Sequence, residues 1–389
     1  MKNSIASIFE TLPYDCKEIK SSKNIKNDFE KVDNCQKCEK IDLKKFKPLE
    51  EQINLNKIDN NFKRCVCGKR HLDIAMAHVL KIMIEEDIPL RKHTLRDGAV
   101  PLITPFTSSP NNHSYVGKDS LVILHPHLNK KVANIIIKEV NEVKGVLKGY
   151  PNDTVGIKDK KSEAITYELL KGSDIRCDIV KIPKNTSLKP KNNSLESKNT
   201  SLKPKNNSLK PKNTSLENSN EDIIAINKIQ HLTYLEFPPS IENKIKVLDN
   251  YLKSKNITEE KLANMTVLDG TCGNGSLGIF LLKKGVKNLI FNDIWKPATF
   301  MTSINLEANG FKTKLINFKD ISDINKTDDI ISIGDNFKVY NLAIEDLKGK
   351  LAISGENKFD ICILDIFPSA DKLNFEKIAN SLAKDVLTI

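Results

Sequence analysis

The chain has 389 residues, which is long for one domain, and it therefore predicts two domains with connecting segments. Its 39% hydrophobic and 29% charged residues are typical of a globular protein and exclude a wholly disordered chain. No run of eighteen apolar residues and no signal-like start occurs, so we expect a cytoplasmic protein with no membrane partner. The net charge of +11 would fit a nucleic-acid partner.

Much of that charge lies in one repetitive segment. From Lys184 to Asn218 a seven-residue unit of the type KNTSLKP occurs five times, with eight Lys and two Glu, which leaves only about +5 (11 − 6) for the rest of the chain. Each unit has a single Leu and three end in Pro, which excludes a coiled coil. We expect residues 184–220 to be a disordered linker, acting as a neutral spacer or as a weakly basic tether.

Two regions precede this linker. Residues 1–60 form a polar segment with a pair of cysteines, and residues 61–183 are predicted to form an α+β domain that recognises the substrate. Helical spacing of apolar residues predicts helices, and short apolar runs predict strands. The predicted elements are a helix over Asp73–Glu85, a strand over Leu121–Leu124, a helix over Lys131–Val143 and a strand over Arg176–Ile182.

Residues 221–389 show an alternation of strands and helices that predicts an α/β, doubly wound, Rossmann-like parallel sheet. One or two strands over 223–237 come first, and Ser240 is expected to cap a helix over 241–253. These early strands, or the N-terminal domain, would complete the edge of the sheet. The predicted strands are 266–268, 288–292, 338–343, 359–364 and 386–389, and the predicted helices are 277–284, 296–309 and 375–383.

A glycine-rich loop follows the first strand of this alternation. It reads Asp269-Gly-Thr-Cys-Gly-Asn-Gly275, and Asp293 ends the next strand. Glycines let the backbone approach a ligand, a helix N-terminus favours a carboxylate, and an acid at this place can accept ribose hydroxyls. Gly273 to Gly278 also fits the dinucleotide pattern GxGxxG, but an acid at the strand tip is unusual there.

The sequence Val267 to Gly275 resembles the first motif of class I S-adenosylmethionine (SAM)-dependent methyltransferases. The resemblance covers about 237–389 and implies SAM as the cofactor. It implies that the strand-tip loop lies around the methionine part, that the acid on the second strand binds the ribose, and that an apolar residue packs against adenine. The implied cofactor-binding residues are Asp269, Gly270, Gly273, Gly275, Asp293, Ile294 and Ile344. The third-strand acid common in this family is replaced by Ala343, and Glu345 and Asp346 are expected to face solvent or start a helix.

The fourth strand ends in Asp365-Ile-Phe-Pro-Ser369, which resembles the Asp/Asn-Pro-Pro-aromatic motif of amino-group methyltransferases. This resemblance makes Asp365, Phe367 and Pro368 the candidate catalytic residues. Asp365 would hold an amine so that its lone pair faces the methyl group, and Phe367 would form a stacking wall. The alternative is that Asp365 orders the loop while Phe367 packs in the core.

A narrower resemblance links the chain to tRNA guanine-N2 dimethyltransferases. It rests on Asn292-Asp-Ile294, Ala298, Asn305, Asn309-Gly310 and the strand ending at Asp365. The methyl acceptor is left open between an RNA base amine in tRNA, with a slight preference, and a protein or small molecule. A SAM-binding regulator without catalysis is a further alternative.

Four N-terminal cysteines form two short hooks, Cys35-x2-Cys38 and Cys65-x-Cys67. Two such hooks can supply four thiolates for a tetrahedral zinc ion, with Cys16 and His71 as alternate ligands. An iron–sulfur cluster and unligated reduced thiols are the other interpretations. Cys177 and Cys272 are expected to be packing residues, and His125 and His127 to belong to an ordinary loop.

Overall fold

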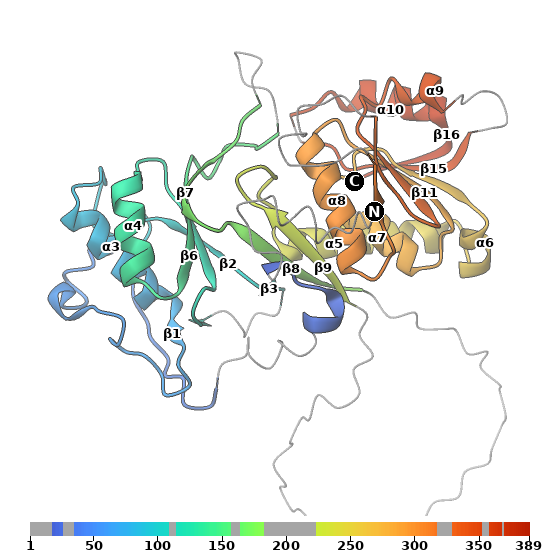
Figure 1. The fold of residues 1–389 in the computed structure, drawn as a ribbon. Helices are drawn as coiled ribbons and strands as arrows, with labels where there is room; N and C mark the ends of the chain where they lie inside the picture. Colours follow the sequence, from blue (N-terminus) through green and yellow to red (C-terminus); the bar gives the residue numbers. More distant parts are fainter. Residues whose placement is uncertain are drawn as a thin grey trace, which may run out of the picture.

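The computed structural model describes residues 18–25, 35–108, 114–156, 164–182, 223–316, 329–351, 358–367 and 369–389. Figure 1 shows an N-terminal half, coloured blue to green, beside a C-terminal half, coloured yellow to red. The predicted linker 184–220, Cys16 and Pro368 lie outside the described residues. No helix among the described residues has both the length and the apolar character needed to cross a bilayer.

The C-terminal half contains a seven-stranded sheet in the order β12-β13-β14-β11-β10-β15-β16. Five neighbouring strands are parallel, which confirms the predicted doubly wound sheet: β14 (Phe337–Tyr340), β11 (Asn288–Asn292), β10 (Thr266–Asp269), β15 (Phe359–Leu364) and β16 (Ala383–Thr388). No sequence pattern predicted the antiparallel edge formed by β12 (Lys314–Leu315) and β13 (Ile330–Ile333), because both strands are too short to show a period.

Helices cover both faces of this sheet (Figure 1). One face packs against α5 (Pro238–Ser254), α7 (Ser276–Lys283) and α8 (Lys296–Ala308), and the other against α9 (Leu347–Lys350) and α10 (Lys372–Leu382). The short α6 (Glu259–Ala263) precedes β10. The prediction that Ser240 caps α5 was wrong: the helix begins two residues earlier at Pro238, whose ring presets the first helical turn.

The N-terminal half has its own four-stranded sheet, in the order β2-β5-β6-β7. Its strands are β2 (Val100–Ile103), β5 (Leu121–Leu124), β6 (Val143–Lys148) and β7 (Glu168–Gly172). Helices α3 (Leu72–Glu85) and α4 (Lys130–Glu139) share an apolar core with it, and β1 (Arg70–His71) pairs with β4 (Tyr115–Val116). The helix predicted over 131–143 ends early, because the chain must turn at 140–142 to enter β6.

A third sheet joins β3 (Phe106–Thr107), β8 (Ile175–Lys181) and β9 (Ile223–Ile229). Strand β9 runs antiparallel to β8, with Lys181 opposite Ile223. In the sequence, the predicted linker 184–220 therefore connects two strands that pair with each other. Of the two alternatives for the edge of the seven-stranded sheet, completion by the strands around 223–237 was wrong, because β9 pairs with β8 in this third sheet.

The close packing of α7 on β11 provides a test of this fold. A Cβ added to Gly278 would lie 2.1 Å from a ring carbon of Phe291, which is buried. We expect Gly278→Ala to lower the free energy of unfolding by about 2 kcal/mol, measured by urea denaturation, because helix or ring must move. Gly349→Ala is the matched control, since a Cβ there meets nothing within 4 Å. An equal effect of both substitutions would contradict this packing.

Candidate active site

Three carboxylates lie at the carboxyl ends of three adjacent parallel strands. Asp269 ends β10, Asp293 directly follows β11, and Asp365 directly follows β15. In open α/β sheets this edge is where ligands bind. The sheet order therefore brings together three acids that are up to 96 residues apart in the sequence (365 − 269).

The glycine-rich loop lies directly above β10. Gly273 and Gly275 have φ angles of +53° and +85°, a region that residues other than glycine rarely adopt. A Cβ on Gly273 would meet no atom within 4 Å, whereas one on Gly275 would lie 2.8 Å from Thr302. The loop thus offers bare backbone on its Gly273 side and close packing against α8 at Gly275.

Side chains of α8 and β11 fix this loop from outside it. The Thr302 hydroxyl donates to the Gly273 carbonyl at 2.8 Å, and the Asn305 amide donates to the Asn274 carbonyl at 3.0 Å. The Asn292 amide donates to the carbonyls of Gly270 and Leu342, tying β10 to the segment after β14. Asn292 and Asn305 were noticed only through the family resemblance, and nothing in the sequence indicated that they hold the loop.

Asp269 is fully buried. Its Oδ2 accepts a hydrogen bond from the Gly278 amide in the first turn of α7, and its Oδ1 has no partner among the described residues. Burial raises the pKa of Asp269 to about 8; the Gly278 amide opposes this rise, and the charges of Asp365 and Asp293 add to it. A positively charged ligand beside Asp269 would lower this pKa and favour the ionised carboxylate.

Asp293 connects the second strand to the glycine loop. Its Oδ2 accepts from the Gly273 amide at 2.9 Å and its Oδ1 from the Trp295 amide at 2.8 Å. Burial raises the pKa of this carboxyl, while the two amides lower it. Each carboxylate oxygen can accept a second hydrogen bond, so both remain able to bind hydroxyls.

The two apolar residues named for this site differ in accessibility. Ile294 is 70% exposed beside Asp293, whereas Ile344 is only 4% exposed and belongs to a core cluster. A Cβ on Gly270 would lie 3.1 Å from Ile344, so these two residues pack against each other. Ala343 is half-buried, and Glu345 and Asp346 are exposed just before α9.

The fourth-strand acid is held by an ion pair. Lys244 of α5 lies 2.6 Å from Asp365 Oδ2 and 2.7 Å from Glu236 Oε1. The Asp365 amide donates to the Thr271 hydroxyl at 2.8 Å. Burial raises the pKa of Asp365, and Lys244 lowers it. Neither Lys244 nor Glu236 had a sequence signal, because each belongs to an otherwise ordinary segment.

Phe367 packs edge-to-face against Tyr234, with ring centroids 5.1 Å apart. Phe367 is half-buried and Tyr234 is 38% exposed. Tyr234 belongs to the connector between β9 and α5, so this aromatic pair joins two distant parts of the chain. Pro368, the third residue named at this place, lies outside the described residues.

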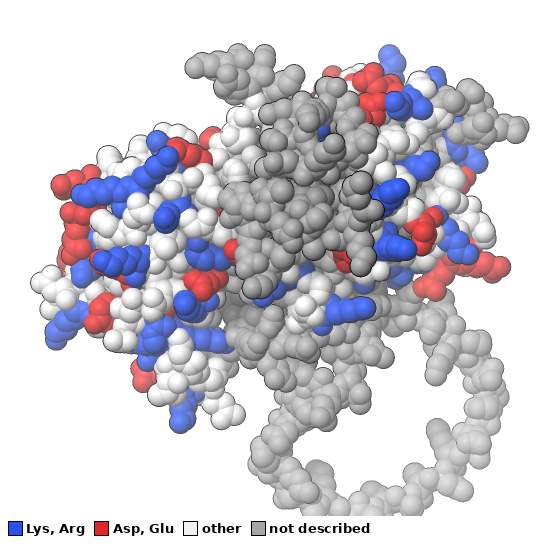
Figure 2. Space-filling model, in the orientation of Figure 1, with Lys and Arg blue, Asp and Glu red and all other residues white. Residues whose placement is uncertain are grey.

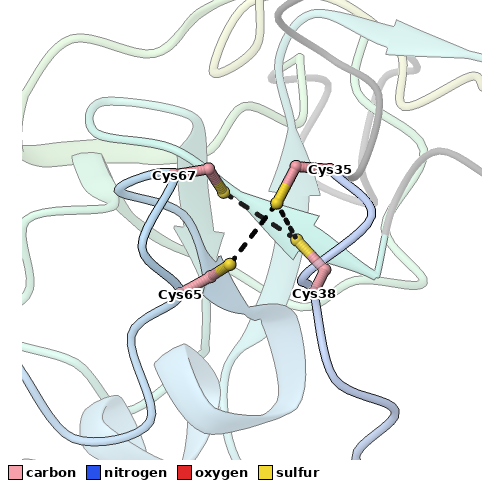
Figure 3. A group of neighbouring side chains, drawn as sticks. All are labelled: Cys35, Cys38, Cys65 and Cys67. Atoms are coloured by element: carbon pink, nitrogen blue, oxygen red, sulfur yellow. Dashed lines mark hydrogen bonds between the residues drawn. The ribbon is translucent and has the colours of Figure 1, made fainter.

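The structure brings the four N-terminal cysteines together (Figure 3). All four Sγ atoms lie within 4.8 Å of one another, with Cys35–Cys65 at 3.5 Å and Cys38–Cys67 at 3.8 Å. Zn–S bonds of about 2.3 Å in a tetrahedron place the sulfurs about 3.8 Å apart. The thiols therefore have the spacing that a zinc ion requires.

The remaining cysteines and histidines lie elsewhere. His71 caps α3 by accepting from the Asp73 amide and does not belong to the cysteine group. Cys177 and Cys272 are buried packing residues. His125 is buried at the end of β5, and its ring lies 5.6 Å from that of His127.

Comparisons with known proteins give partial likenesses. No protein-family model and no curated protein matches the chain. Among solved structures, TYW2 from Pyrococcus horikoshii in complex with MeSAdo is 14% identical, with 79% of this chain and 76% of that chain covered and a TM-score of 0.35. The M. jannaschii tRNA m1G37 methyltransferase is 12% identical, with 79% and 62% covered and a TM-score of 0.33.

A Haemophilus influenzae protein described as a candidate methylase is 22% identical over 35% of this chain, with a TM-score of 0.23. The chain spans 60% of the length of that protein. Identities and scores this low assign no activity to the chain.

The buried acid Asp269 provides a test of the electrostatics. Its folded-state pKa of about 8 lies well above the ordinary value for an aspartate, which is 3.8, so its stabilising contribution is complete below about pH 4 and is lost as the pH rises to 8. Asp269→Asn, without ligand, should therefore gain stability over wild type as the pH rises, by on the order of a few kcal/mol at pH 8. Thermal unfolding at pH 4 and pH 8 measures this difference. An equal stability difference between Asp269→Asn and wild type at both pH values would show that ionisation of Asp269 does not destabilise the folded protein.

Proposed function

We propose that the chain is a SAM-dependent methyltransferase. The observation that carries the proposal is the group of three carboxylates, Asp269, Asp293 and Asp365, which lie at one edge of a parallel sheet beside the glycine-rich loop. The cationic sulfonium and ammonium groups of SAM suit such a site. A dinucleotide would instead place its anionic pyrophosphate beside Asp269, which is unfavourable.

The residues present fit the parts of this cofactor. The bare backbone at Gly273 and the first turn of α7 would receive the methionine part, with Gly275 allowing the turn. Asp293 would accept the ribose hydroxyls, and exposed Ile294 would pack against adenine. Gly270 and Ile344, which pack against each other, would support the adenine-binding surface. When bound, SAM supplies a methyl group activated by the positive sulfur.

We propose an amine as the acceptor, with Asp365, Phe367 and Pro368 on the acceptor side. Asp365 would accept a hydrogen bond from the amine and thereby keep the lone pair of the amine nitrogen directed at the methyl carbon. The new N–C bond forms as the S–C bond breaks with its electron pair left on sulfur, so S-adenosylhomocysteine is the coproduct. The proton lost from nitrogen can pass to the Asp365 carboxylate.

An RNA base amine, as in tRNA, is the acceptor we favour. The resemblance to guanine-N2 dimethyltransferases and the exposed ring of Tyr234 against Phe367 support it. A protein or small metabolite is the alternative, since on the face in Figure 2 the described Lys and Arg side chains are interspersed with Asp and Glu. A SAM-binding regulator is the third candidate. For each of these three candidate functions, we propose that the protein acts in the cytoplasm.

We also propose that Cys35, Cys38, Cys65 and Cys67 bind a structural zinc ion. The sulfur spacing supports it, and so does the turn at Gly68, whose φ of +84° closes the second hook. Arg64 and Arg70 flank that hook and both pair with Glu142, which is buried. The ion would thereby tie the segment around Cys35 to the N-terminal core.

Labelling experiments test the reaction. With radiolabelled SAM and total tRNA, protein and small-metabolite fractions from the source cell, we expect label in tRNA. Asp365→Ala should lower transfer at least about 100-fold while SAM binding by calorimetry is retained, because only acceptor alignment is lost. Asp371→Asn is the matched control, since it keeps the cap of α10. Label in protein or metabolites would exclude the RNA acceptor, and label in no fraction would favour the regulator.

Metal analysis tests the cysteine site. We expect about one zinc ion per purified chain, and loss of that zinc in the double variant Cys35→Ser/Cys67→Ser. Cys177→Ala should keep the metal, because Cys177 lies outside the group. Equal metal content in wild type and the double variant would refute the zinc site.

A further inference from the structure

We infer that Lys244 is a positioning residue for Asp365, and that Glu236 and a buried group of charges hold Lys244 in place. The inference rests on the proposed function, because Asp365 is there the residue that aligns the acceptor. We assign Lys244 no contact of its own with substrate or cofactor. Its role is exerted through the carboxylate.

The ammonium group of Lys244 is fixed from two sides. Asp365 Oδ2 lies 2.6 Å from its nitrogen and Glu236 Oε1 lies 2.7 Å from it. All three side chains are mostly buried. A lysine side chain is otherwise flexible, and two charge-assisted hydrogen bonds restrict it to one position. The Asp365 carboxylate is thereby held in one orientation at the end of β15.

Glu236 is in turn anchored through both its side chain and its backbone. The Ser240 hydroxyl donates to Glu236 Oε1 at 3.1 Å. The Glu236 carbonyl accepts from Arg176 at 2.6 Å and from Lys228 at 2.8 Å. Both cations lie 2.7 Å from the same oxygen of Asp178. These contacts form a continuous chain from the sheet of β8 and β9 to the edge where Asp365 lies.

Arg176, Asp178 and Lys228 form a fully buried charge cluster. Such clusters are expensive to desolvate, and apolar residues of similar size often give equal or greater stability. Stability alone therefore does not account for this cluster. Its contacts to the Glu236 carbonyl give it a role, because they fix the connector that carries Glu236 and Tyr234 beside the acceptor edge.

Charges act on Asp365 from several elements. Lys244 of α5 is positive and Glu236 of the connector is negative, and the carboxyl groups of Asp269 and Asp293 lie at the same edge of the sheet. Burial and the charge of Glu236 favour a protonated Asp365, and Lys244 opposes them. Without Lys244 the carboxyl would be protonated at a higher pH and would be free to rotate.

Methyl transfer to the labelled fraction tests the inference in the full chain. We expect Lys244→Met to lower kcat about 100-fold with an unchanged Kd for SAM, and to move the acid limb of the pH profile up by about one pH unit. Lys244→Arg should retain activity within about tenfold, because it keeps the charge. Lys246→Met, on an exposed position of the same helix, is the matched control.

A second readout needs no activity. The 13C-carboxyl resonance of Asp365, assigned with Asp365→Asn, should titrate at higher pH in Lys244→Met than in wild type and Lys246→Met. If Lys244→Met shifts neither the titration midpoint of Asp365 nor the acid limb of the pH profile, the inference is wrong, even if kcat falls. If wild type binds SAM but methylates nothing, the proposed function fails, and the titration still decides whether Lys244 controls Asp365.

Discussion

Three buried carboxyl groups at one edge of a sheet are the constraint on which the rest of the site depends. Asp269, Asp293 and Asp365 are brought there by the order of β11, β10 and β15, and burial raises the pKa of each. The charge of Asp365 adds to this rise at Asp269 and Asp293. The loop amides and Lys244 offset part of this unfavourable energy. The cationic ligand that we propose for the site would offset more of it.

The proposed acceptor side is built from two segments of the chain that are far apart in the sequence. The connector after β9 supplies Tyr234 and Glu236, while the C-terminal sheet supplies Asp365 and Phe367. The indole of Trp295 donates to the Leu232 carbonyl at 2.6 Å and holds the same connector beside Asp293. If the proposed acceptor side is correct, binding of an acceptor would depend on how β8, β9 and this connector pack against the seven-stranded sheet.

Sequence patterns predicted the features that depend on neighbouring residues. The glycine loop, the strand-tip acids and most strands and helices of residues 266–389 were predicted because strand, loop and helix follow one another directly in the chain. The two cysteine hooks were recognised for the same reason, and the structure brings their sulfurs together. In each case a local spacing carries the chemical information.

Contacts between distant segments were decided only by the tertiary structure. Pairing of β8 with β9 across the repeat segment, the short β12–β13 edge and the burial of Ile344 have no local pattern. Lys244 is one lysine among many until folding places it between Glu236 and Asp365. The sequence by itself thus determined which cofactor chemistry to expect. The tertiary structure decided which charges meet, because that depends on strand order and not on spacing along the chain.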